Sequence, residues 1–66
     1  MEPMPYQILF FRGSKLIGTQ VSGATLEATQ QAARVGFRER GAEHMEIIDI
    51  DSGAEVWSFT EGLSRQ

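Results

Sequence analysis

Apolar residues are concentrated in four short segments of the chain, and they follow a helical period in one longer segment. Residues 6–12 and 15–21 are rich in aromatic and β-branched side chains and have the length of strands. Residues 44–50 and 54–59 have the same character. Between the two pairs, residues 25–40 place small and apolar side chains on one side of a helix. The pattern therefore predicts strand, strand, helix, strand and strand, in that order.

The first two predicted strands are separated by Gly13 and Ser14, which suit a two-residue type II′ hairpin turn. If Arg12 pairs with Lys15, the register is fixed. It then contains the pairs Phe11–Leu16, Phe10–Ile17, Leu9–Gly18, Ile8–Thr19, Gln7–Gln20 and Tyr6–Val21. Gly18 inside a strand indicates a bulge or a close approach of another group.

The helix and the second hairpin also carry end signals. Thr25 is the expected N-cap, and Gly41 is the expected left-handed residue after the last turn. The side expected to face the sheet consists of Leu26, Ala28, Thr29, Ala32, Ala33, Val35, Gly36 and Phe37. Small Gly36 near the centre of this side predicts a close approach of helix to sheet. A three-residue loop over 51–53 is expected to pair Ile47 with Trp57, Met45 with Phe59, Ile48 with Val56 and Ile50 with Ala54.

These elements predict an α+β, two-layer ββαββ domain with a mainly antiparallel four-stranded sheet and one helix on one face. Strands 1 and 3 are the most apolar, so the favoured strand order is 2-1-3-4. A parallel pairing of strands 2 and 3 stays open because a helix connects them. The domain is expected over 6–59, with tails at 1–5 and 60–66 and with Met1 or Met4 as the translation start. This layout resembles several small bacterial domains, and no motif in it identifies a family.

Both faces of the predicted sheet carry large apolar side chains, whereas one helix covers one face only. One face is expected to hold Tyr6, Ile8, Phe10, Ile17, Val21, Ile48, Ile50 and Val56, and the other to hold Leu9, Phe11, Leu16, Met45, Ile47, Trp57 and Phe59. A bare apolar face of this kind marks an interaction site. We therefore expect a homodimer formed through the sheet face or edge that the helix leaves uncovered. The alternatives are another protein partner, or twist and bulges that move some of these residues to the edge of the core.

The expected partner-binding residues are Leu9, Phe11, Leu16, Ile47, Trp57 and Phe59. Trp57 and Phe11 are the expected anchors, because aromatic side chains dominate the energy of interfaces. Trp57→Ala is then expected to loosen the assembly without unfolding the chain. Loss of folding would instead assign Trp57 to the core.

Composition agrees with a small single domain that gains from association. The chain has 66 residues, 41% hydrophobic, and no cysteine, so disulfides and thiolate chemistry are excluded. Domains below ~70–80 residues usually add disulfides, a metal or oligomerisation. The net charge of −3 argues against a general nucleic-acid binder and against an anionic membrane surface. Without a signal peptide or a long apolar run, the expected location is cytoplasmic.

No catalytic, metal or cofactor motif stands out, and the protein is not expected to be an enzyme. Asp49, Asp51 and Glu55 around Gly53 lack the spacing of a calcium loop. His44 is the only histidine and is interpreted as a surface residue near acids. The seven glycines never form a phosphate-binding motif.

Two alternative functions remain open. Arg34, Arg38 and Arg40 on the helix are candidates for nucleic-acid contact, which predicts salt-dependent binding. A ligand pocket at a dimer seam around His44 and Trp57 is the other alternative. Neither is favoured over self-association.

Overall fold

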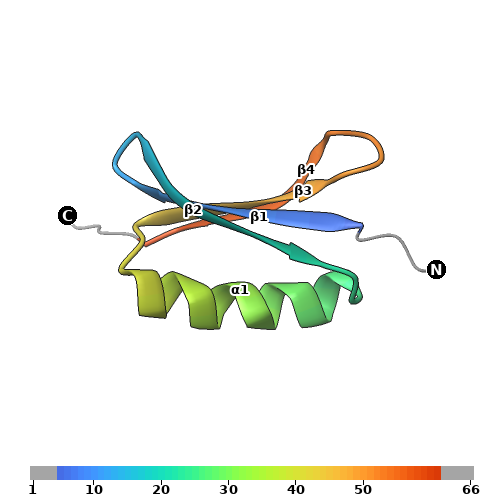
Figure 1. The fold of residues 1–66 in the computed structure, drawn as a ribbon, viewed down its shortest axis with the longest axis horizontal. Helices are drawn as coiled ribbons and strands as arrows, with labels where there is room; N and C mark the ends of the chain where they lie inside the picture. The colour runs from blue at the N-terminus through green and yellow to red at the C-terminus, as the bar shows by residue number, and fades with distance from the viewer. Residues whose placement is uncertain (1–4, 62–66) are drawn as a thin grey trace.

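The computed structural model describes residues 5–61 and confirms the α+β ββαββ fold. Strands β1 (Tyr6–Arg12) and β2 (Lys15–Ser22) precede helix α1 (Leu26–Arg40), and strands β3 (His44–Asp49) and β4 (Glu55–Thr60) follow it. All pairings are antiparallel and the strand order is β2-β1-β3-β4, so β2 and β3 are not neighbours. Helix α1 lies on one side of the sheet, and the tips of both hairpins turn away from it (Figure 1).

The first hairpin has the predicted turn but a different register beyond it. Gly13 has a φ of +62°, as the first central position of a type II′ turn requires, and Arg12 pairs with Lys15. A bulge at Ile17 then shifts the pairing, so Phe10 lies opposite Gly18 rather than Ile17. The bulge also corrects the other expected pairs, which become Leu9–Thr19, Ile8–Gln20, Gln7–Val21 and Tyr6–Ser22.

Gly18 explains why the strand deviates at this point. A Cβ atom at Gly18 would lie 2.8 Å from Nε of Arg40, so the glycine leaves room for that side chain. The guanidinium of Arg40 lies 4.7 Å from the ring centroid of Phe10. The sequence predicted either a bulge or a close approach of another group at Gly18. Both occur, because the bulge lies beside the approach of the Arg40 side chain.

The second hairpin keeps two predicted pairs and changes its loop. Met45–Phe59 and Ile47–Trp57 are confirmed, whereas Ile48 pairs with Glu55 and not with Val56 because the register shifts there. Ile50 leaves the ladder, and its N–H bonds the carbonyl of Pro5 at 2.8 Å instead. The Asp49 N–H bonds the carbonyl of Ala54, and the loop between β3 and β4 covers 50–54 rather than 51–53. Gly53 has the predicted left-handed conformation, with a φ of +75°.

The strand β4 is longer at its end than the sequence predicts. Thr60 was expected in the C-terminal tail but pairs with His44, and the N–H of Glu61 bonds the carbonyl of Glu43 at 2.9 Å. The rest of the expected tails, residues 1–4 and 62–66, lies outside the described residues.

Helix α1 begins and ends as predicted. The hydroxyl of Thr25 accepts a hydrogen bond from the N–H of Ala28, and Gly41 is left-handed with a φ of +66°. Its buried side is narrower than expected and consists of Thr29, Ala33 and Gly36, with Leu26 and Phe37 packed at its margins. Val35 is 58% exposed and Ala28 is exposed, so their assignment to the buried side is wrong. The buried side of α1 is narrow because its small residues let the helix approach the sheet closely along one line of contact.

The core lies between α1 and the two central strands. Ile8 of β1 lies opposite Ile47 of β3, and Phe10 opposite Met45. All four side chains are fully buried, together with Ala33 of the helix. The expected grouping of sheet faces is therefore wrong, because it put Ile8 and Phe10 on the face opposite Met45 and Ile47.

Candidate functional site

The side of the sheet that faces away from α1, here called the open face, carries five apolar side chains, four of them on β1 and β2. Its apolar members are Leu9, Phe11, Leu16, Val21 and Ile48. Leu16 and Val21 are each 49% exposed, and the other three are half-buried. Across the sheet, from β2 to β4, the rows are Leu16, Phe11, His44 and Thr60; then Thr19, Leu9, Glu46 and Ser58; then Val21, Gln7, Ile48 and Glu55.

Apart from Ile48, the β3–β4 half of the open face is polar, and its side chains form hydrogen bonds with one another. Nδ1 of His44 lies 2.6 Å from Oγ1 of Thr60, and its Nε2 lies 3.0 Å from a carboxylate oxygen of Glu46. The His44 ring also lies against Phe11, with centroids 5.6 Å apart. Sequence reasoning missed this arrangement because it placed Thr60 in the tail.

A hydroxyl, an imidazole and a carboxylate in line are the groups of a nucleophile, its base and an orienting acid. Acyl transfer would also need backbone donors for the developing oxyanion and a pocket that holds the substrate. His44 lies on the sheet surface and does not line the cavity between α1 and β4, nor the one on α1 at Thr25, Glu27, Ala28 and Gln31. We therefore interpret Thr60, His44 and Glu46 as a hydrogen-bond network that holds the Phe11 ring in position on the open face.

The sheet separates the six residues expected to bind a partner. Leu9, Phe11 and Leu16 lie on the open face. Ile47, Trp57 and Phe59 lie on the helix side, where Ile47 is fully buried and Trp57 is half-buried against the core. The expectation that all six share one uncovered face is wrong. The reason is the β1–β3 register, which puts Ile47 beside Ile8 rather than beside Leu9.

Trp57→Ala is consequently expected to act on folding. The indole is half-buried and packs against the core, and the guanidinium of Arg34 lies 5.4 Å from its centroid. Removing a half-buried aromatic ring should lower the free energy of unfolding by about 1–2 kcal/mol, less than full burial would cost. Urea unfolding followed by circular dichroism measures this change. If Trp57→Ala leaves the urea midpoint unchanged and weakens the dimer, Trp57 belongs to the interface and not to the core.

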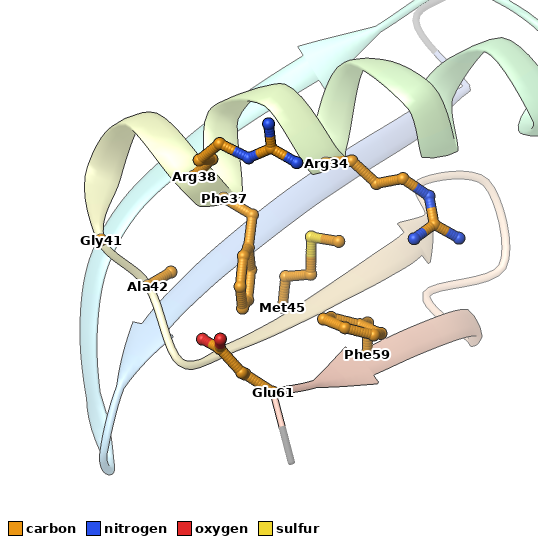
Figure 2. Close-up of a pocket in the computed structure, with 8 residues that line it drawn as sticks. All are labelled: Arg34, Phe37, Arg38, Gly41, Ala42, Met45, Phe59 and Glu61. Carbon is orange, nitrogen blue, oxygen red and sulfur yellow. The ribbon is translucent and has the colours of Figure 1, made fainter. Parts of the chain in front are cut away.

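A groove opens on the helix side between the C-terminal half of α1 and β4, here called the α1/β4 groove (Figure 2). Its volume is about 340 Å³. Phe37, Met45 and Phe59 form its apolar floor. Arg34 and Arg38 reach over it from the helix, and Glu61 stands at the end of β4 on the other wall (Figure 2).

Aromatic rings give the β4 wall of the groove a defined shape. Phe59 meets Phe37 edge to face at 5.3 Å and lies parallel to Trp57 at 6.3 Å. The guanidinium of Arg34 lies over both Trp57 and Phe59, at 5.4 and 5.8 Å from the ring centroids. Cation–π contact of this kind holds a long, exposed side chain in place.

The three candidate arginines do not form one basic surface. Arg34 and Arg38 line the α1/β4 groove. Arg40 instead lies over Phe10, and its side chain also reaches the positions of Gly18 and Gly36. A nucleic-acid strand that contacts all three would have to bridge different sides of the helix.

Among residues 5–61, no three histidine or acidic side chains are close enough to hold a metal ion. Helix α1, the one helix in this part of the chain, is too short and too polar to cross a bilayer. Comparisons with protein-family models, with curated proteins and with solved structures each find no match to this chain.

Proposed function

We propose that this protein is a non-catalytic interaction module that forms a homodimer through the open face of its sheet. The observation that supports the proposal is a set of five apolar side chains on this face, which no segment among residues 5–61 covers: Leu9, Phe11, Leu16, Val21 and Ile48. Leu16, Phe11 and Leu9 are direct neighbours, whereas Gln7 and Thr19 lie between them and the other two. An antiparallel sheet with one solvated face normally alternates apolar and polar positions, with the polar ones outward. Here four of the six outward positions of β1 and β2 are apolar, and Gln7 and Thr19 are the polar ones.

A second copy suits this patch better than a polar partner does. Sheets pack face to face at about 10 Å through interdigitating apolar side chains. A two-fold axis along the strands, above the space between β1 and β2, sets β2 of one copy over β1 of the other. Leu16 then lies against Phe11 of the second copy, and the polar residues around His44 stay at the rim. Apolar centre and polar rim are the usual anatomy of an interface.

The dimension of the open face sets the expected strength. Four strands about 4.8 Å apart and three rows about 7 Å apart span roughly 15 Å in each direction. That footprint, roughly 225 Å² per copy, is well below the about 800 Å² per partner of a standard specific interface, so the open face alone gives a weak contact. We therefore expect a dimer that dissociates on dilution through the micromolar range.

Light scattering coupled to size exclusion tests the proposal. At high micromolar concentration the wild-type chain should have twice the mass of one 7.3 kDa chain. Leu16→Lys and Val21→Lys place a charge at positions that are each 49% exposed in one chain, so they should leave the fold intact and give a monomer.

Val35→Lys is the matched control. Val35 is 58% exposed on the outer side of α1, so the same change should leave the dimer unaffected. A monomeric wild-type chain at high concentration would overturn the proposal, and so would dissociation by Val35→Lys to the same extent as by Val21→Lys.

A further inference from the structure

We infer that the α1/β4 groove binds a small organic monoanion with an apolar body, such as an aryl or alkyl carboxylate. The groove opens on the helix side of the sheet, opposite the open face, so a ligand there and a second copy of the chain do not compete. This binding site is therefore independent of the proposed dimer.

The floor and volume of the groove suit the apolar body of such a ligand. Ligand sites are mostly apolar clefts of about 300–1,000 Å³ with a few polar groups that fix orientation. The groove has about 340 Å³ and a floor of Phe37, Met45 and Phe59. Phe59 is 36% exposed although it packs against Phe37 and Trp57, so one of its sides stays available to a ligand.

Two guanidinium groups supply the complement to an anion. Arg34 and Arg38 are four residues apart on α1 and so lie on the same side of the helix. Within residues 5–61, neither guanidinium has a carboxylate oxygen within 4.0 Å. The guanidinium carbon of Arg34 lies over the rings of Trp57 and Phe59, and its N–H groups can donate to a carboxylate in the groove.

Glu61 on the other wall limits the charge that the groove accepts. Its carboxylate repels a second negative charge, so a monoanion should bind better than a dianion of the same size. It also offers an acceptor to a hydroxyl or amide on the ligand. Glu61→Gln should therefore tighten binding of a simple carboxylate by a few fold.

Binding of 2-naphthylacetate, with 2-naphthylacetamide as its neutral counterpart, tests the inference. Trp57 is the only tryptophan, so its indole N–H gives one resonance in a ¹H–¹⁵N spectrum that reports on the β4 wall. We expect saturable movement of this resonance with the carboxylate and about tenfold weaker binding of the amide. Calorimetry on the same chain gives the affinity independently of the reporter.

Charge-removing variants assign the site. Arg34→Gln and Arg38→Gln should each weaken binding of 2-naphthylacetate about tenfold, as loss of a charge-assisted hydrogen bond does. Lys15→Gln removes the same charge from the exposed start of β2, outside the groove, and should change nothing. Circular dichroism shows that each variant is folded.

Three results would overturn the inference. These are no saturable binding of 2-naphthylacetate, equal affinity for the neutral amide, and unchanged affinity in the folded double variant of Arg34→Gln and Arg38→Gln.

Discussion

Phe10→Ala is expected to leave the domain largely unfolded at room temperature. The Phe10 ring is fully buried between β1, β3 and α1, and it lies under the guanidinium of Arg40. Truncation of a buried phenylalanine costs about 3–5 kcal/mol, because apolar contacts are lost and a cavity remains. A folded chain of this length is stable by about 3–10 kcal/mol, at roughly 0.05–0.15 kcal/mol per residue. The substitution therefore removes a large part or all of the stability.

Urea unfolding measures this loss, and Phe11→Ala is its matched control. Phe11 follows Phe10 in the same strand but points to the open face, where it is half-buried. The same truncation there should cost clearly less. Both variants are best compared in the Leu16→Lys background, because dimer formation would otherwise add to the apparent stability. Equal costs at the two positions would contradict the assignment of the core to the helix side.

The local features of the fold were predictable because local chemistry determines them. Gly13 and Gly53 mark the two turns, and Thr25 and Gly41 mark the two ends of the helix. Each works through its own φ or a hydrogen bond to a near neighbour in the sequence. The strand order followed from the apolar character of strands 1 and 3, because central strands are the most buried.

The register between β1 of the first hairpin and β3 of the second was not predictable from such local signals. Apolar residues occupy both sides of β1, so the alternation that normally fixes the inward side is missing there, although β3 alternates from His44 to Ile47. Ile8 and Leu9 are both large and apolar, so the sequence alone does not show which of them faces the core. The choice depends on the β1–β3 register, which pairs Ile8 with Ile47 across a connection that contains the helix.

The bulge at Ile17 has a similar origin. The glycine at position 18 indicated an irregular strand. The side chain that occupies the space beside it is Arg40, at the C-terminal end of α1, and no local pattern relates these two residues. The α1/β4 groove was missed for the same reason. The groove is formed by Arg34 and Phe37 of α1 and by Phe59 of β4, and no local sequence pattern predicts how these two elements lie relative to each other. The sequence did show that Arg34 and Arg38 are neighbours on the helix.

Gly36→Val is expected to lower the free energy of unfolding by about 3 kcal/mol, at the upper end of the cost of overpacking a core. Gly36 is buried, and a Cβ atom there would lie 2.9 Å from Cζ of Phe10. That ring is fully enclosed and has no free direction in which to move. Glycine inside a helix costs about 1 kcal/mol relative to alanine, so its presence here is explained by the close approach of α1 to the sheet.

Ala28→Val on the exposed side of α1 is the control, because it changes helix propensity alone and should cost less than about 1 kcal/mol. A double-mutant cycle then isolates the contact. Phe10→Leu shortens the side chain that Gly36 faces, so Gly36→Val should be less harmful in that background, with a coupling of about 1–2 kcal/mol. If the two changes are simply additive, the cost of Gly36→Val arises elsewhere in the helix. The distance between α1 and β1 would then not be set by the Phe10 ring against Gly36.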